Sequence, residues 1–157
     1  ADLTRQRRQY GWKNRYESDS PGINSRMDEL QASILRIKLR TLKWQVMQRQ
    51  KWAMKYDAAL ANNTRIRAPM TRVGGVHAYH QYVVRCAQRD ELMSHLQSKG
   101  IPTAILYPSA LHQQKAWQQR GEFSESECAA TELLALPLHP YLSEDSVEHV
   151  CTALSDF

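Results

Sequence analysis

Apolar residues recur at helical spacing over a long stretch that contains neither proline nor glycine. From Met27 to Ala61 helix-forming residues dominate. Two apolar series run through this stretch, the first Met27, Leu30, Ile34 and Ile37, the second Leu35, Leu39, Leu42, Val46, Ala53, Tyr56 and Leu60. This pattern predicts one long helix with two apolar faces. At 1.5 Å per residue it would extend roughly 50 Å, so the first face needs a cover beyond a small domain.

The rest of the chain alternates between strand and helix signals. Asn62-Asn63-Thr64 ends the long helix, and a linker follows through Pro69 and Gly74-Gly75. The later elements are expected as strands over 78–86 and 101–108, helices over 89–100, 111–119 and 125–134, an extended segment over 134–140 and a last helix from Ser143. This order predicts an α+β two-layer domain with a small, mostly antiparallel sheet, one long N-terminal helix and several shorter helices.

Composition divides the chain into three expected parts. Residues 1–24 form a basic extended arm with an asparagine loop, residues 25–61 the long helix, and residues 62–157 a small C-terminal α+β domain. The arm has little apolar periodicity, so it needs another surface to lie on. Ser25 and Asp28 indicate a capping-box variant at the start of the helix.

Charge and cysteine usage narrow the function classes. Residues 1–55 carry 13 Lys/Arg against 5 Asp/Glu, and residues 56–157 carry 8 against 11. The basic third could attract phosphate, nucleic acid or an acidic surface, but no nucleic-acid motif accompanies it, so a solvated basic face is favoured. Three scattered cysteines without a CxxC pair indicate a reduced, cytoplasmic setting and no zinc site. His77 and His80 would point to opposite faces of a strand, so no metal site is expected. No apolar run is long enough to span a membrane.

Five ordered segments carry a family resemblance over nearly the whole chain. They are RQYGWKNRY at 8–16, GINSRMDELQA at 22–32, RDELMSHLQSKGI at 89–101, ILYPSALHQQKAW at 105–117 and ELLALPLHPYLSEDSVEHV at 132–150. Together they resemble the C-terminal part of sugar aminotransferases of the DegT/DnrJ type, which use pyridoxal phosphate (PLP). The resemblance implies a parent enzyme that moves an amino group from glutamate to a keto-sugar nucleotide.

The resemblance also assigns roles to individual residues. Asn24 matches the family asparagine that reaches across the dimer to the cofactor phosphate of the partner subunit. Tyr107 and His112 match a stretch near the sugar-nucleotide site, although Leu106 stands where many members have histidine and Ala110 where many have proline. From the residues alone, Asn24 could instead be a turn asparagine bonded to its own backbone, Tyr107 a packed residue at a strand end, and His112 a surface histidine. Glu127, Glu132 and His139 are expected to cap helices or face solvent.

The PLP-binding lysine is the element that the resemblance does not supply. Seven lysines occur, and none lies in the Ser-rich loop that precedes a Gly-rich turn in the family. We therefore expect no catalytic residue, no cofactor bound by this chain alone, and no metal. Two hypotheses stay open: the C-terminal portion of an aminotransferase that needs a missing N-terminal domain, and a free-standing module that self-associates. A basic nucleic-acid binder is a weaker third.

Overall fold

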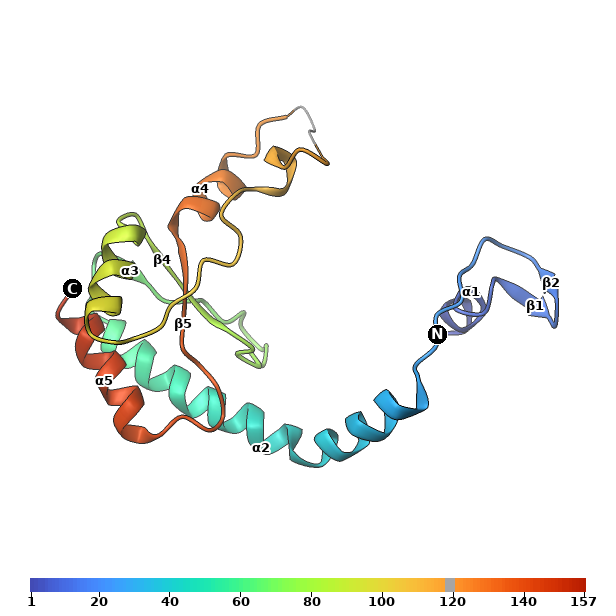
Figure 1. The fold of residues 1–157 in the computed structure, drawn as a ribbon, viewed down its shortest axis with the longest axis horizontal. Helices are drawn as coiled ribbons and strands as arrows, with labels where there is room; N and C mark the ends of the chain where they lie inside the picture. The colour runs from blue at the N-terminus through green and yellow to red at the C-terminus, as the bar shows by residue number, and fades with distance from the viewer. Residues whose placement is uncertain (118–120) are drawn as a thin grey trace. The chain divides into compact units, whose positions relative to one another are not determined.

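The computed structural model describes residues 1–117 and 121–157, which form two compact units, residues 1–42 and residues 43–157 (Figure 1). The first unit contains α1 (Asp2–Arg7), β1 (Trp12–Asn14), β2 (Glu17–Ser18) and the beginning of α2 (Glu29–Leu60). The second contains the rest of α2, then β3 (Ile66–Arg67), β4 (Tyr82–Cys86), α3 (Arg89–Ser98), the 3-10 turn η1 (Leu111–Gln113), α4 (Ser124–Glu132), β5 (Leu133–Leu136) and α5 (Glu144–Ser155). The predicted α+β class with a long helix and an antiparallel sheet is confirmed.

The sheet of the second unit has one face covered by helices and one face without them. Its strands lie in the order β3-β4-β5, all antiparallel, with Tyr82 opposite Leu136 and Arg85 opposite Leu133. Because side chains alternate along a strand, Tyr82, Val84 and Cys86 enter the core while Val83 and Arg85 face the other way. The core is completed by buried side chains of α2, α3 and α5, among them Tyr56, Leu92, Leu96, Val147 and Leu154.

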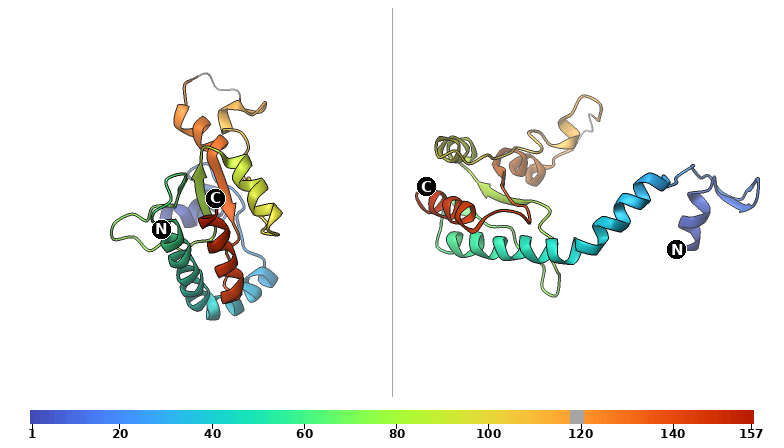
Figure 2. Two further views of the ribbon diagram at one scale, coloured as in Figure 1. Left: turned by 90° about the vertical axis from the view of Figure 1, so that its left-hand side faces the viewer. Right: turned by 60° about the horizontal axis from the view of Figure 1, so that its bottom comes forward.

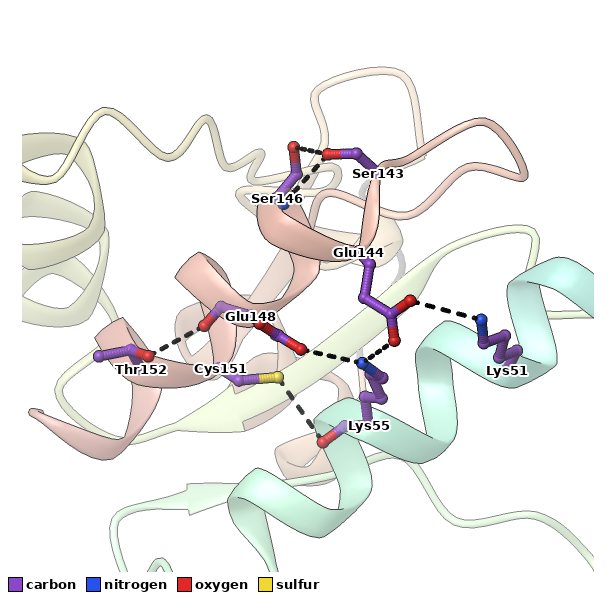
Figure 3. Close-up of polar contacts among 8 residues, drawn as sticks. All are labelled: Lys51, Lys55, Ser143, Glu144, Ser146, Glu148, Cys151 and Thr152. Atoms are coloured by element: carbon purple, nitrogen blue, oxygen red, sulfur yellow. Dashed lines mark hydrogen bonds and ion pairs between the residues drawn. The ribbon is translucent and has the colours of Figure 1, made fainter.

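The C-terminal half of α2 and α5 run side by side on the covered face of the sheet (Figure 2). Lys55 donates to Glu144 at 2.6 Å and to Glu148 at 3.3 Å, and Lys51 lies 3.9 Å from Glu144 (Figure 3). The Cys151 thiol points at the Lys55 carbonyl, 3.7 Å away. These contacts fix the two helices against each other around an apolar seam.

The last helix begins where its sequence predicts. The Ser143 hydroxyl accepts from the Ser146 backbone N–H at 3.1 Å and lies 2.7 Å from the Ser146 hydroxyl. Glu144 and Asp145 place negative charge in the first turn, where the helix dipole favours it. This N-cap fixes the position of α5 along the sheet.

Three expected elements differ from the structure. The strand predicted over 101–108 is wrong: only Ala104 pairs with β5, through Ala135, because Pro102 and Pro108 have no N–H to donate. The strand predicted over 78–86 begins at Tyr82, so His77 and His80 lie in a loop. The helix predicted over 111–119 is reduced to η1, and residues 118 and 119 lie outside the described residues.

The first unit has more regular structure than an extended arm. Its first residues form α1, and a two-stranded ribbon of β1 and β2 follows. Between α1 and β1 the chain makes a tight turn, in which the Trp12 N–H donates to the Gln9 carbonyl at 3.1 Å. Tyr10 and Gly11, the central residues of this turn, both have positive φ, 60° and 74°, as in a type I′ turn.

The N-terminal half of α2 presents apolar side chains to solvent. Leu30 is 74% exposed, Ile34 47% and Ile37 64% on the first predicted face, and Leu39 on the second is 62% exposed. From Trp52 onward the same helix is buried at Ala53, Tyr56 and Leu60. The second apolar series is therefore a core series only in its C-terminal part.

Among the described residues, no helix combines the length and the apolar character needed to cross a bilayer.

Candidate functional site

The Asn24 loop is attached to the end of α1 by backbone hydrogen bonds. The Ile23 N–H donates to the Arg7 carbonyl at 2.8 Å, and the Ser25 N–H donates to the Arg8 carbonyl at 2.9 Å. Between them, Asn24 forms an isolated antiparallel bridge with Gln9. The two residues that flank Asn24 are thus fixed by main-chain atoms, and Asn24 itself is exposed.

Two glycines allow the Asn24 loop to lie close to the end of α1 and the turn after it. A Cβ on Gly22 would come within 2.1 Å of the Gly11 nitrogen and 2.6 Å of the Arg7 carbonyl oxygen. A Cβ on Gly11 would come within 1.7 Å of the Ser20 carbonyl oxygen. Neither position accommodates a larger residue without movement of the backbone.

The helix that follows begins later than the capping-box interpretation predicts. α2 starts at Glu29, and the Asp28 carbonyl accepts from the Ala32 N–H at 2.9 Å. Asp28 therefore occupies the N-cap position, and Ser25 lies outside the helix. Within the described part of the chain, the Asn24 side chain makes no hydrogen bond, so the turn in which it bonds to its own backbone is not observed.

Tyr107 stands between two pockets on the uncovered side of the sheet. Its side chain is 74% exposed. One pocket, of about 280 Å³, is lined by Gln81, Val83, Ala104, Leu106, Tyr107, Leu133 and Ala135. The other, of about 390 Å³, extends from Tyr107 and Leu133 to Leu111 and Ser126. Tyr107 is a rim residue rather than a packed residue at a strand end.

His112 is held by a partner from α4. Its Nε2 lies 2.8 Å from Glu127 Oε1, its ring lies 4.6 Å from that of Phe123, and its side chain is only 13% exposed. The surface-histidine interpretation is therefore wrong, and Glu127 pairs with His112 rather than only facing solvent. The pocket beside it, about 190 Å³, shares Leu111 and Ser126 with the pocket at Tyr107.

The structure thus brings Tyr107 and His112 onto adjoining pockets of the second unit, while Asn24 belongs to the first. Glu127 is 15 residues from His112 in sequence, and no local sequence pattern connects the two. The one available signal was an acidic residue in the first turn of a predicted helix, and the sequence favoured a capping or solvent-facing role for it.

Glu132 is the other residue that sequence reasoning placed wrongly. The Glu132 carboxylate accepts hydrogen bonds from Arg85 Nε at 2.8 Å and from the Cys128 thiol at 3.1 Å. It also forms an ion pair with Arg67 Nη2 at 3.5 Å. The Cys128 hydrogen bond, followed by that of Arg85, lowers the pKa of the Glu132 carboxyl. The same contact with Glu132 raises the pKa of the Cys128 thiol, which disfavours the thiolate. This cluster ties α4 to β3 and β4.

Several lysines of the described residues take part in ion pairs. Lys13 lies 3.6 Å from Asp19, and Lys99 lies 2.8 Å from Asp156. No lysine lines the five pockets described for this structure, so the residues present do not fit a PLP site that is complete within this chain. The described residues also contain no group of three or more His, Cys, Asp or Glu placed to hold a metal.

Comparison with known proteins identifies relatives along the whole chain. The model of the DegT/DnrJ/EryC1/StrS aminotransferase family matches residues 1–155. The UDP-2-acetamido-2-deoxy-3-oxo-D-glucuronate aminotransferase of Pseudomonas aeruginosa is 36% identical over 157 residues, covering 99% of this chain and 44% of the relative. The dTDP-3-amino-3,4,6-trideoxy-alpha-D-glucose transaminase of Streptomyces venezuelae is 34% identical, covering 100% of this chain and 42% of the relative.

Solved structures give the same coverage. The crystal structure of S. venezuelae DesV in complex with a ketimine intermediate superimposes with a TM-score of 0.86 at 34% identity, over 99% of this chain and 43% of that one. A DegT DnrJ EryC1 StrS aminotransferase from Brucella abortus superimposes with a TM-score of 0.84 at 32% identity, again over 99% and 43%. The chain spans less than half the length of the relatives that it matches.

Proposed function

Because the chain belongs to the DegT/DnrJ/EryC1/StrS aminotransferase family, we propose that it is the C-terminal portion of a sugar-nucleotide aminotransferase. The observation that carries this proposal is the match of the family model over residues 1–155, together with the fact that the chain covers only 44% and 42% of the length of the two relatives described above. The parent enzyme would transfer an amino group from glutamate to a keto-sugar nucleotide.

Within such an enzyme, Asn24 supplies a hydrogen bond to the cofactor phosphate of a partner subunit. Three features support this role: the side chain is exposed, it has no hydrogen-bond partner among the described residues, and its neighbours Ile23 and Ser25 are fixed through their backbone N–H groups. A neutral amide N–H suits a phosphate oxygen and does not depend on pH.

Tyr107 and His112 supply polar contacts to the sugar. The Tyr107 side chain reaches the rim that separates two pockets, and its hydroxyl can donate or accept. His112 has Nε2 engaged by Glu127, which leaves Nδ1 as the ring nitrogen for a ligand. The Glu127 contact fixes the ring orientation.

The chain alone is expected to be inactive, because PLP enzymes hold the cofactor through a lysine and the lysines here lie outside the pockets described. The test is to incubate the purified chain with PLP, record the aldimine absorbance band and add borohydride. No reducible band is expected. A stoichiometric, borohydride-sensitive adduct on one lysine would overturn the proposal of inactivity.

A second candidate is a self-associating module, favoured by the exposed apolar residues of the first half of α2. Leu30 and Ile37 are more than 60% exposed on one face, and Leu39 is equally exposed on the other. Contiguous apolar surface of this kind marks an interaction site. Light scattering over a concentration series decides this candidate, since a strict monomer at high concentration would exclude it.

A further inference from the structure

The pocket between Tyr107 and the uncovered face of the sheet is lined mostly by aliphatic side chains. Val83 comes from β4, Leu133 and Ala135 come from β5, and Ala104 and Leu106 come from the segment bridged to β5. The pocket measures about 280 Å³. It opens to solvent at Leu106, which is 39% exposed, and at Tyr107.

The backbone at the floor of this pocket offers few hydrogen bonds to a ligand. The Ala104 N–H donates to the Ala135 carbonyl at 3.1 Å, and the Ala135 N–H donates to the Ala104 carbonyl at 2.9 Å. The polar side-chain groups of the lining are the Gln81 amide and the Tyr107 hydroxyl. A hydroxyl placed against Leu106, Val83 and Leu133 would lose its water without gaining a partner, whereas a methyl group would gain by leaving water.

We propose that this pocket binds a methyl-bearing substituent of the sugar nucleotide and that Leu106 is the residue that sets this preference. The inference rests on the proposed function, because it takes Tyr107 as a residue that contacts the sugar. In this arrangement the Tyr107 hydroxyl binds a polar group of the sugar at the rim, and the adjoining methyl enters the space beside Leu106.

The volume leaves room for either of two common sources of a sugar methyl. One is the C6 methyl of a 6-deoxyhexose, and the other is the methyl of an acetamido group. Both present the same chemistry to Leu106, since each places a methyl group where the reference sugar ends in a hydroxyl. The experiment therefore uses one matched pair of ligands for each source.

The first pair is dTDP-fucose and dTDP-galactose, which differ by the hydroxyl at C6, and the second is UDP-N-acetylglucosamine and UDP-glucose. Each is titrated into the chain, with the ¹³C methyl signals of Leu106 and Leu133 followed by NMR. We expect the methyl-bearing member of at least one pair to bind about fivefold to twentyfold more tightly, the range for one apolar group in a partly open pocket. Preference within the first pair alone identifies the C6 methyl, and preference within the second alone identifies the acetamido group.

Leu106→Asn, which keeps the side-chain size and adds polar atoms, should remove most of this preference. Leu111→Asn is the matched control, since Leu111 is exposed and lines the neighbouring pocket but not this one. If Leu106→Asn does not fold, the wild-type Leu106 methyl shifts still decide: a larger shift with the methyl-bearing member of a pair than with its control supports the inference, and equal shifts within both pairs overturn it.

Two outcomes overturn the inference, and they differ in what they leave standing. Equal affinities within both pairs, with binding weakened by Tyr107→Phe, would remove the preference at Leu106 but keep Tyr107 as a sugar contact. Binding of none of the four nucleotides at millimolar concentration would remove both the pocket and the substrate role of Tyr107.

Discussion

The hydroxyl of Tyr82 on β4 donates a hydrogen bond to the Asp57 carboxylate on α2 at 2.5 Å. The Tyr82 ring is completely buried and lies edge-on to Tyr56, with ring centroids 5.1 Å apart. Tyr56 in turn donates to the Pro137 carbonyl at 2.9 Å. Two buried tyrosines thus connect the helix, the central strand and the segment after β5 through their hydroxyl groups.

Removing the Tyr82 hydroxyl is expected to destabilise the second unit. Tyr82→Phe should lower the free energy of unfolding by about 2 kcal/mol at neutral pH, because a hydrogen bond to a charged acceptor is lost. Urea denaturation followed by circular dichroism measures the change. Tyr141→Phe is the control, since Tyr141 is 70% exposed and should change stability little.

The same tyrosines predict sensitivity to alkali. Burial, and then the hydrogen bond to Asp57, raises the pKa of Tyr82 above its ordinary value of 10.0, and burial also raises the pKa of Tyr56. Because the folded-state pKa is raised, this contribution is fully present below pH 10.0 and is lost as the pH rises beyond it. Stability should therefore fall above that pH, and less steeply in Tyr82→Phe. An unchanged slope in the variant would contradict this assignment.

Acid should weaken the contact between α2 and α5. The hydrogen bond from Lys55, helped by the charge of Lys51, lowers the pKa of Glu144 below its ordinary value of 4.5. This contribution is present above pH 4.5 and is lost as the pH falls through the lowered value. Glu144→Gln should make the melting temperature less dependent on pH in this range. Glu125→Gln, at an exposed carboxylate of α4 without an ion pair among the described residues, should leave the dependence as in the wild type.

Gly22→Ala should displace the Asn24 loop. The added methyl would lie 2.1 Å from the Gly11 nitrogen, so the chain must move and the hydrogen bonds of Ile23 and Ser25 should break. We expect amide exchange at these two residues to accelerate at least tenfold, which is about 1.4 kcal/mol of local opening. The melting of the second unit should not change. Gly74→Ala is the control: its methyl meets nothing within 4 Å, and although the φ of 74° strains alanine in the second unit, the Asn24 loop should remain protected.

The N-cap of α5 offers a matched pair of serines. Ser143→Ala removes the oxygen that accepts from the Ser146 N–H and should cost about 1 kcal/mol. Ser146→Ala keeps that N–H and removes only the contact between the two hydroxyls, so a smaller loss is expected. Thermal unfolding of both variants distinguishes capping from a general effect of losing a hydroxyl. Equal losses would refute the capping assignment.

If the chain self-associates through the exposed part of α2, Ile34→Ser should weaken the association and leave the fold intact. Ile34 is 47% exposed, so its replacement should change the free energy of unfolding by less than about 0.5 kcal/mol. Sedimentation equilibrium measures the association constant. Thr41→Ser, a change of one methyl group on the same helix, is the control.

Long elements with repeating patterns were predictable from the sequence, and elements held by distant partners were not. The periodicity of α2, Gly100 after α3 and Ser143 before α5 each depend on residues close in sequence. β3 has only two residues and exists through its pairing with Cys86 and Arg85. The segment 101–108 has the composition of a strand, but its two prolines have no backbone N–H to donate. Only Ala104 pairs with the sheet.

The candidate site shows the same division. The residues Asn24, Tyr107 and His112 were selected from the resemblance, and their roles remain proposals. Their surroundings depend on tertiary contacts that no local pattern contains: Glu127 on the next helix contacts His112, and Tyr107 and Leu133 line the same pocket. The arm was expected to be extended because α1 and the hairpin are too short to produce a periodic signal.

The attachment of the Asn24 loop through main-chain atoms has a consequence for how this region tolerates mutation. The carbonyl groups of Arg7 and Arg8 accept hydrogen bonds from the Ile23 and Ser25 N–H groups, and every residue type at these two acceptor positions presents the same carbonyl group. A saturation library should therefore accept most side chains at positions 7 and 8. Gly11 and Gly22 should accept almost none. Sensitivity to mutation around Asn24 would therefore be found at the two glycines and not at the two arginines whose carbonyl groups hold the loop.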